Sequence, residues 1–556
     1  MIFNTTDFLQ IIFILGVIFI ATPPLGAFMF KVFNGEQLLL MKALRPLETG
    51  TYKMSGVNPN EEMNWKQYAT SLVVFNFIGL VFLILLQMMQ GSLPLNPEHF
   101  GNISWHLALN TAVSFMTNTN WQAYSGENTM SYLAQMLGLG VQNFVSAATG
   151  LAVLLAFARG FARKQTKSLG NFWVDLVRGT VYVLLPLSVI LSIVLVGEGV
   201  VQNFNAYKHV TTIEGREQTI PQGPAASQVA IKQLGSNGGG FFGANSAHPF
   251  ENPSPLSNFL EMISILLIAS SCTYLFGLMV GSRRQGWVLF GTMMGLMVVM
   301  LMISLWSEYH YGTMEGKETR FGIMNSVMWS VFTTSASNGS VNGMLSSVSP
   351  LSGGIAMLNM MLGEVVFGGV GAGMYGILLF VILTVFLSGL MVGRTPEYLG
   401  KKIEAREIYW VMIGVIAPCA TILVGSALSL VSPAGLAGLG HQGPHGLSEV
   451  LYAFASTAGN NGSSFGSLSI NTVYYNCMTA LAMLIGRFAV IIPVLAVAGS
   501  LVEKKIAPPS PGTFHTDTFL FAALLAAVIL IVGALTFFPA LSLGPILEHL
   551  LMIMKM

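Results

Sequence analysis

Long apolar runs alternate with short polar loops from one end of the chain to the other. Ten of the runs approach the roughly 20 residues that an α-helix needs to cross the hydrocarbon core of a bilayer. They cover residues 8–30, 66–90, 131–160, 171–197, 255–281, 287–308, 353–392, 408–431, 472–500 and 518–540. Because lipid offers no partner to backbone N–H and C=O groups, such runs predict helices. The pattern therefore predicts an all-α polytopic membrane protein with ten spans.

Four shorter apolar segments lie between the long runs, and each leads into a polar loop that contains asparagine. They are Ile103–Met116, Ala225–Leu234, Met324–Thr333 and Gly446–Ser456, and all are too short to cross a bilayer. An irregular loop at membrane depth is tolerated only where protein buries it or where it lines water. We therefore expect four pore helices that cross half of the membrane, each followed by a loop that turns back.

The four polar loops recur along the chain as Thr117–Gln122, Gly235–Gly240, Thr334–Ser340 and Thr457–Ser463. When they are aligned on Asn120, Asn237, Asn338 and Asn461, the intervals are 117, 101 and 123 residues. The predicted unit is a helix, a pore helix, a filter loop and a second helix. Four fused units of this kind, arranged in pseudo-four-fold symmetry, predict a pore on the common axis.

The predicted organisation adds one helix at each end of the four repeats. Residues 1–65 hold an extra N-terminal span with a cytoplasmic loop, and residues 501–556 hold a C-terminal span. The repeats cover residues 66–160, 171–281, 287–392 and 405–500.

Charge predicts the orientation of these spans. Charged residues make up 9% of the chain, against about 25% in soluble domains, and the net charge of +1 gives no indication of a nucleic-acid partner. Eighteen of the 25 lysines and arginines flank the odd-numbered loops, six lie on the other side, and Arg487 falls within a span. Because cytoplasmic loops are enriched in Lys and Arg, both termini and all four polar loops are expected outside.

The polar loops have the chemistry of a site for a weakly hydrated monovalent cation. Backbone carbonyls and neutral side-chain oxygens replace a hydration shell without a fixed charge that would trap the ion. The loops contain no Asp or Glu, which argues against a Ca²⁺ site, so potassium is the expected ion. The candidate filter residues are Asn118, Thr119, Asn120, Gln122, Ser236, Asn237, Gly238, Gly239, Ser337, Asn338, Gly339, Ser340, Gly459, Asn460, Asn461 and Gly462.

The loops, including Gly235–Phe242, resemble the filter loops of the potassium-binding subunits of Kdp potassium-transporting ATPases, and the resemblance extends over the whole chain. That family is similar to the superfamily of potassium transporters built from fused potassium-channel-like units. The resemblance implies a high-affinity potassium uptake subunit of a bacterial plasma (inner) membrane. It also implies three partners besides membrane lipid: a P-type ATPase catalytic subunit, a single-span accessory subunit and sometimes a small stabilising peptide.

The chain itself carries no sequence motif for ATP. Gly312–Lys317 has the wrong glycine spacing for a P-loop, and the phosphorylation motif Asp-Lys-Thr-Gly does not occur. We therefore expect a non-ATPase subunit of the translocase, whose uphill transport is powered by its partner. The alternative is a self-sufficient potassium channel or an ion-gradient-driven potassium transporter of the same superfamily. His441 and His445 lie in a glycine-rich outer loop and are expected to be solvated.

The four loops are not equivalent. Two positions after the aligned asparagine, the first loop has Gln122, whereas the others have Gly239, Ser340 and Ser463. Because a single chain can hold such asymmetry, we expect Gln122 to supply or gate a side-chain ligand that makes the site tight and slow. The alternative is a glutamine that only packs behind the filter.

The seventh run, at 40 residues, is too long for one straight crossing, and eight glycines lie between Gly353 and Gly376. Each internal glycine costs about 1 kcal/mol of helix stability relative to alanine, so we expect a break. The resemblance implies that this break lies below the filter and obstructs direct passage to the cytoplasm; the alternative is close helix packing through small residues. The candidate gate residues are Gly368, Gly369, Gly371 and Gly373.

Two ionisable residues lie inside apolar runs, Glu364 in the seventh and Arg487 in the ninth. Such groups are costly at membrane depth and usually face a cavity or each other. We expect both to line the cavity where the ion leaves the filter, where they could pair with each other. The alternative is an isolated ion pair with a purely structural role.

Overall fold

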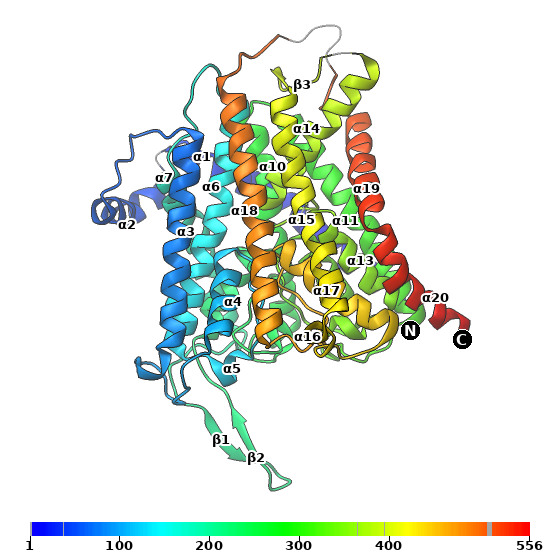
Figure 1. Ribbon diagram of the computed structural model, residues 1–556. Coiled ribbons are helices and arrows are strands. Elements are labelled where there is room, and N and C mark those ends of the chain that lie inside the picture. The colour runs from blue at the N-terminus through cyan, green and yellow to red at the C-terminus, as the bar shows by residue number, and fades with distance from the viewer. Residues whose placement is uncertain (1–2, 37, 364, 394, 509–513, 556) are drawn as a thin grey trace.

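The computed structural model describes residues 3–36, 38–363, 365–393, 395–508 and 514–555. Within these ranges ten helical segments are long and apolar enough to cross a membrane, which confirms the predicted number of spans (Figure 1). They are α1 (Thr5–Phe33), α3 (Trp65–Met88), η2 (Ala134–Gly140) with α6 (Val141–Ala162), α7 (Phe172–Arg178) with η3 (Gly179–Leu184) and α8 (Leu185–Gly197), α10 (Pro255–Met279), α11 (Arg283–Tyr311), α14 (Ala372–Val392), α15 (Ala405–Val431), α18 (Val473–Glu503), and α19 (Phe519–Leu541) with η6 (Ser542–Ile546) and α20 (Leu547–Lys555).

Polar residues fix where several spans begin. The Asn64 side chain accepts the backbone N–H of Gln67 at the start of α3, and the Gln67 side chain accepts the N–H of Asn64 at 3.0 Å. Ser254 and Ser257 form the same reciprocal pair at the start of α10. These capping boxes satisfy N–H groups that the first helical turn leaves unpaired. The ends of the spans are thus set locally by the sequence.

Burial separates inner from outer spans. The apolar window of the η2–α6 span is 83% buried and that of α10 is 78% buried, whereas α1, α3 and α15 are each 28% buried. Because lipid is as apolar as a protein core, the exposed leucines and phenylalanines of the outer helices have a compatible surrounding. The inner helices α6 and α10 therefore form the wall around the centre of the molecule.

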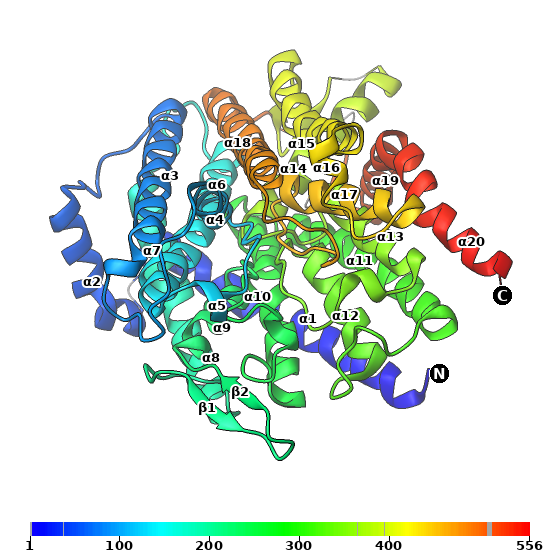
Figure 2. The ribbon, with the colours of Figure 1, turned by 60° about the horizontal axis from the view of Figure 1, so that its bottom comes forward.

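Four shorter helices lie within this wall: α4 (Trp105–Met116), α9 (Ala225–Leu234), α12 (Gly322–Ser335) and α17 (Gly443–Ala458). They confirm that helices form at the four predicted segments, with ends that differ by no more than three residues, whereas their role as pore helices stays a prediction. Figure 2 shows them at four corners around the centre. Every residue from Ser326 to Ser340 is buried, so the loop after α12 satisfies the condition for irregular backbone at membrane depth.

The seventh predicted run is broken, as its glycine content indicated. α13 (Pro350–Met361) ends before the glycine-rich segment, and α14 begins at Ala372. Gly368 and Gly371 have positive φ angles of 59° and 78°, which glycine adopts without steric cost. A Cβ at Gly371 would collide with the carbonyl oxygen of Gly150 in α6. The predicted break and the alternative of close packing through small residues therefore both occur in this segment.

The remaining elements lie at the two ends of the bundle. Both chain termini lie at one end in Figure 1, together with a hairpin of β1 (Lys208–Thr211) and β2 (Glu217–Ile220), in which Lys208 pairs with Ile220. The opposite end carries the short pair β3 (Glu397–Tyr398) and β4 (Lys401–Lys402), and α2 (Leu39–Ser55) projects from the side of the bundle. Short helical turns complete the connections: η1 (Gln90–Ser92), α5 (Gly126–Thr129), η4 (Asn245–Ala247), η5 (Leu345–Ser347) and α16 (Pro433–Leu436).

Candidate ion-binding site

All four pore helices end in the same backbone conformation. The φ and ψ angles are −83° and 3° at Thr117, −82° and 0° at Gly235, −91° and 6° at Ala336, and −83° and 6° at Gly459. The next residue in each loop has a positive φ angle: 64° at Asn118, 49° at Ser236, 46° at Ser337 and 49° at Asn460. Non-glycine residues rarely adopt this conformation, so its recurrence at one position indicates a shared loop structure.

The residue that follows donates its N–H to the carbonyl oxygen five residues earlier in every loop. These bonds join Thr119 to Ser114 at 2.9 Å, Asn237 to Lys232 at 2.9 Å, Asn338 to Thr333 at 3.0 Å and Asn461 to Ser456 at 2.8 Å. The residue after it again has a positive φ angle, 53° at Asn120, 82° at Gly238, 87° at Gly339 and 101° at Gly462.

The backbone therefore aligns Thr119, and not Asn120, with Asn237, Asn338 and Asn461. The predicted alignment of the first loop is wrong by one residue. Asn120 occupies the position that glycine holds in the other loops, because asparagine is among the few residues that tolerate a left-handed conformation. The buried Trp121, rather than Gln122, is then the counterpart of Gly239, Ser340 and Ser463.

Close backbone contacts join neighbouring loops. A Cβ at Gly238 in loop two would collide with the carbonyl oxygen of Asn338 in loop three. A Cβ at Gly339 would collide with that of Asn461 in loop four, and a Cβ at Gly462 with that of Thr119 in loop one. Loop one reaches loop two through Asn120, whose Nδ2 would lie 2.7 Å from a Cβ at Gly239. The contacts follow the chain order and close on themselves, so the four loops form a ring.

Hydrogen bonds cross the same four junctions. Asn118 Nδ2 donates to the carbonyl oxygen of Ser236 at 2.9 Å, and Asn338 Nδ2 donates to that of Lys232 at 3.0 Å. The Ser337 hydroxyl donates to the carbonyl oxygen of Gly459 at 3.1 Å. Asn460 Nδ2 donates to Thr119 Oγ1 at 2.9 Å, which completes the circuit. The loops are thus positioned by one another as well as by their own helices.

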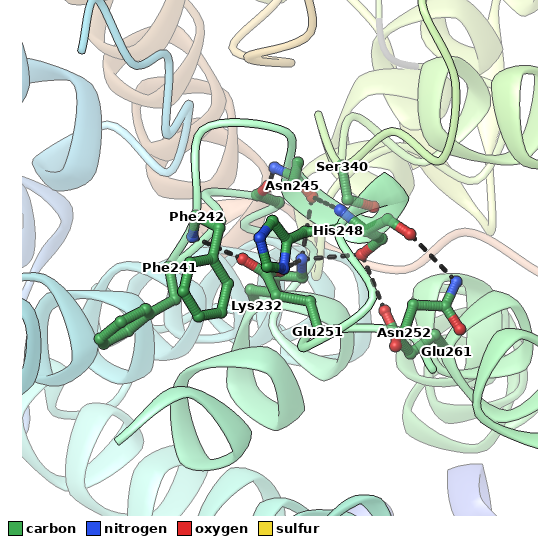
Figure 3. Close-up of polar contacts among 12 residues, drawn as sticks. Lys232, Phe241, Phe242, Asn245, His248, Glu251, Asn252, Glu261 and Ser340 are labelled. Carbon is green, nitrogen blue, oxygen red and sulfur yellow. Dashed lines mark hydrogen bonds and ion pairs between the residues drawn. The ribbon is translucent and has the colours of Figure 1, made fainter. Parts of the chain in front are cut away.

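A buried ion pair that the sequence analysis did not identify supports loop two (Figure 3). Lys232, at the end of α9, and Glu251 have fully buried side chains and form an ion pair. The Lys232 ammonium group also donates to Asn245 Oδ1 at 2.9 Å and to the Ser246 hydroxyl at 2.8 Å. Glu251 Oε1 accepts the N–H of Phe242 at 2.7 Å. All three ammonium protons have partners, as a buried charge requires.

The same network continues into loop three. Gln233 Nε2 donates to Glu261 Oε2 at 2.8 Å, and its Oε1 accepts the Ser340 hydroxyl at 3.0 Å. Ser340 is therefore held from loop two, and Trp329 Nε1 donates to its carbonyl oxygen at 2.9 Å. Because Lys232 and Gln233 are adjacent, one turn of α9 supports two of the four loops. In the sequence, only the position of the basic residue Lys232 beside a filter loop indicates this network.

His248 closes the outer side of loop two. Its ring stacks on Phe242 with centroids 4.1 Å apart, and Nδ1 accepts the N–H of Phe250 at 3.1 Å. Burial lowers the pKa of His248, so the ring is neutral at pH 7. The support of loop two thus contains one neutral ring and one balanced ion pair.

Gln122 contacts a neighbouring loop instead of projecting freely. Its Nε2 donates to the carbonyl oxygen of Gly240 at 2.9 Å, and its Oε1 accepts the N–H of Gly240 at 2.9 Å. Nε2 also lies 3.1 Å from the Tyr124 hydroxyl. The side-chain amide of Gln122 therefore joins loop one to loop two by hydrogen bonds. A role of Gln122 as an ion ligand stays a prediction.

A hollow of about 430 Å³ lies on the side from which the loops leave the ring. Loops one, three and four line it through Gln122, Gly339 and Ser463, and the segment that follows loop two lines it through Ala244. Lys317 also lines it, but its ammonium group lies 2.9 Å from the buried carboxylate of Glu308. Glu318 lines the hollow as well, and its carboxylate lies 3.1 Å from Arg320 Nε. Both charged residues of the lining therefore have a partner of opposite charge.

The predicted gate lies on the opposite side of the ring. The N–H of Gly368 donates to the carbonyl oxygen of Ser335, the last residue of α12, at 2.9 Å. A Cβ at Gly369 would lie 4.0 Å from Asn118 Nδ2. Gly368 and Gly369 thus lie directly against two loops, whereas Gly373 packs on the carbonyl group of Phe367.

Arg487 also lies on this side, and it is 5% exposed. Its guanidinium group donates to the carbonyl oxygen of Ser146 at 3.3 Å and to the Tyr375 hydroxyl at 3.4 Å. Ser146 in turn donates to Asn118 Oδ1 at 2.8 Å, so one residue separates Arg487 from loop one. Arg487 and Tyr375 line a cavity of about 50 Å³. Glu364 lies outside the described residues, so its predicted pairing with Arg487 stays a prediction.

Known proteins resemble this chain in sequence or in fold. Residues 12–550 match the family model described as "Potassium-transporting ATPase A subunit". The chain is 57% identical to the potassium-transporting ATPase potassium-binding subunit of Rhodospirillum centenum, over 98% of this chain and 97% of the relative. The protein of the same name from Pseudomonas aeruginosa is 53% identical over 98% of this chain and 99% of the relative. The crystal structure of the potassium transporter TrkH from Vibrio parahaemolyticus has a similar fold, with a TM-score of 0.51 at 14% identity over 75% of this chain and 83% of that one.

Proposed function

The chain belongs to the family of potassium-transporting ATPase A subunits, and from this premise we propose that its ring of four loops is the site that selects potassium. The chain is the potassium-binding, non-ATPase subunit of a P-type ATPase system. The observation that carries the proposal is the closure of the ring, in which three of the four junctions bring a backbone carbonyl oxygen of one loop against a glycine of the next, and the fourth is made by the Asn120 side chain. A ring of carbonyl oxygens is the arrangement that replaces the hydration shell of a potassium ion.

Four pore helices support this assignment electrostatically. Each helix ends directly before its loop or within the first two residues of it, so four C-terminal ends meet the ring. A helix C-terminus carries the equivalent of about half a negative charge. Four such ends attract a monovalent cation without binding it as tightly as a carboxylate would. Potassium therefore binds and still leaves.

The neutral composition of the ring favours potassium over divalent ions. The aligned positions after each cap hold only Asn, Ser, Thr and Gly residues. Within the described residues, the buried oxygens Asn120 Oδ1 and Asn237 Oδ1 accept no hydrogen bond. Buried acceptors without a donor are costly, and a bound cation or an ordered water offsets that cost.

The pathway that we propose starts at the hollow above the ring. The ion enters the hollow, exchanges its hydration water for ring carbonyls, and stops against the segment between α13 and α14. Gly368 and Gly369 obstruct direct passage, Gly371 turns the chain through its positive φ angle, and Gly373 lets the carbonyl group of Phe367 pack closely against α14. Arg487 lines the space where the ion leaves the filter, and a place for Glu364 in the same space stays a prediction.

Energy for uphill transport comes from a partner. We propose that the chain assembles with a P-type ATPase catalytic subunit, a single-span accessory subunit and, in some complexes, a small stabilising peptide. We propose that both termini and the hollow lie outside a bacterial inner membrane, which the distribution of Lys and Arg supports.

Purification of the complex from native membranes tests this function. A stable association with a P-type ATPase subunit and ATP hydrolysis stimulated by potassium are the expected results. Potassium flux from the isolated chain in the absence of ATP would instead indicate the channel or ion-gradient alternative. The naming of the full-length relatives as ATPase subunits favours the first outcome.

A further inference from the structure

A second cluster of ligand-type side chains lies at the start of α17, outside the ring. His441, His445 and Glu449 each offer one ligand atom, and these three atoms lie within 4.8 Å of one another. The carboxylate of Glu449 is fully buried, whereas the His441 side chain is 55% exposed. The expectation that both histidines are solvated is wrong for His445, whose side chain is only 19% exposed. The cluster therefore combines a fixed carboxylate with one imidazole that solvent can reach.

The hydrogen bonds of His445 assign its protons. Nδ1 lies 2.9 Å from Oε1 of Glu548 in α20, and Nε2 lies 3.0 Å from the Ser346 hydroxyl. Because a carboxylate only accepts hydrogen bonds, Nδ1 carries a proton, and in the neutral ring Nε2 keeps its lone pair. A histidine that holds its other N–H on a carboxylate is the usual arrangement around zinc. Glu548 thus orients the ring, and a metal bound at Nε2 would replace the hydrogen bond that Nε2 accepts from the Ser346 hydroxyl.

Glu449 is oriented by the backbone. Its Oε2 accepts the N–H of Gly440 at 2.9 Å, and its Oε1 lies 2.6 Å from His441 Nδ1. The carboxylate keeps its backbone contact when the His441 ring turns. His441 is therefore the side chain that moves when an ion enters.

We propose that His441, His445 and Glu449 bind Zn²⁺, with water as the fourth ligand. Two imidazole nitrogens and one carboxylate oxygen form a typical zinc ligand set with an open position. Imidazole ligands favour zinc over hard cations such as K⁺ and Mg²⁺. At Zn–ligand distances of about 2.0–2.2 Å, tetrahedral ligand atoms lie about 3.3–3.5 Å apart, so a turn of the exposed His441 ring closes the site.

The site is connected to the hollow above the ring. The His445 ring stacks on Phe465 with centroids 5.6 Å apart, and Phe465 lines the hollow. The N–H of Ser346 donates to the carbonyl oxygen of Phe465 at 3.1 Å. A bound zinc ion fixes the His445 ring, and with it this wall of the hollow and the hydrogen bond from His445 to Glu548 in α20. External zinc is therefore expected to slow potassium entry. This consequence rests on the proposed function, whereas the binding of zinc itself is independent of it.

Metal binding to the purified full complex tests the site without any transport measurement. Titration calorimetry with Zn²⁺ is expected to give saturable binding, and Co²⁺ is expected to give the visible absorption of a tetrahedral site. H441A and H445A are each expected to weaken zinc binding at least about tenfold, and E548Q by about 10–100-fold. His209 is an exposed histidine of β1 at the same end of the molecule. The variant H209A therefore serves as the control and is expected to bind zinc with the affinity of the native protein.

Unchanged zinc affinity in both H441A and H445A, or no saturable binding to the native protein, would overturn the proposal. H441A is the decisive variant because its exposed side chain is not needed for packing. Potassium uptake by proteoliposomes with external zinc then tests the connection to the hollow. The connection is supported if external zinc slows potassium uptake by the native complex but not by H441A. If zinc leaves uptake by the native complex unchanged, the connection is overturned, and the zinc-binding data alone decide whether the site exists.

Discussion

The side-chain amide of Gln122 forms two hydrogen bonds with the backbone of Gly240, one to the carbonyl oxygen and one from the N–H, both at 2.9 Å. This contact is unique to the junction of loops one and two among the aligned positions, because the other loops have Gly240, Val341 and Ser464 where loop one has Gln122. The amide positions the chain that leaves the ring and lines the hollow above it. The asymmetry of the four loops therefore has a structural use at the entrance.

Replacing Gln122 by glycine is expected to weaken potassium affinity about tenfold and to reduce discrimination against rubidium. Two hydrogen bonds are lost, each worth about 1 kcal/mol net, and the entrance to the ring loosens. Titration of ATP hydrolysis by the purified complex with potassium and with rubidium measures both effects. Gln218→Gly, in the exposed strand β2, is the matched control. Unchanged affinity and discrimination in Gln122→Gly would remove Gln122 from the site.

Alanine at Gly339 is expected to abolish tight potassium binding. Gly339 has a positive φ angle of 87°, and a Cβ there would collide with the carbonyl oxygen of Asn461 in the next loop. Gly215→Ala is the control for backbone strain without a steric collision, because Gly215 has a φ angle of +77° and open space around its Cβ position. Both variants carry the backbone cost of about 1–2 kcal/mol, and only Gly339→Ala distorts the ring. Equal potassium affinity in the two variants would contradict the close contact between loops.

Lys232→Met is expected to destabilise the protein by about 3–5 kcal/mol, because it leaves the buried carboxylate of Glu251 without a counter-charge. The double variant Lys232→Met/Glu251→Gln is expected to regain part of this loss, since the unpaired charge is gone. Thermal unfolding of the purified complex provides the comparison, with Lys208→Met in the exposed strand β1 as the control. If the single and double variants unfold at the same temperature, the pair is not coupled.

Arg487→Gln is expected to slow potassium transport severalfold with little change in potassium affinity. The guanidinium group lies beyond the ring and reaches loop one only through Ser146. Uptake by proteoliposomes and potassium titration of ATPase activity separate the two effects. The exposed Arg216 supplies the control Arg216→Gln. Native flux in both Arg487→Gln and Glu364→Gln would exclude a role of these residues in the exit from the filter.

Segment length made most of the fold predictable. Runs near 20 residues gave the spans, and α9 has the bounds that its apolar segment predicted. The break before α14 followed from glycine content, because glycine is a poor helix former. The short hairpin β1–β2 and α2 escaped prediction because neither contains an apolar run long enough to cross a bilayer.

The alignment of loop one with the other three loops could be determined only from the backbone angles and hydrogen bonds. Three loops place glycine after the aligned asparagine, whereas loop one places Asn120 after Thr119, so matching asparagines shifted the alignment by one residue. Long-range pairs such as Lys232 with Glu251 and His445 with Glu548 depend on how loops fold over helices. Residue type alone does not reveal such contacts.

Anomalous diffraction from crystals of the complex grown with rubidium tests the central claim most directly. The account predicts a rubidium peak inside the ring, within coordination distance of the carbonyl oxygens of Thr119, Asn338 and Asn461, which is lost in Gly339→Ala. A ring without rubidium, in crystals that bind the ion elsewhere in the chain, would contradict it.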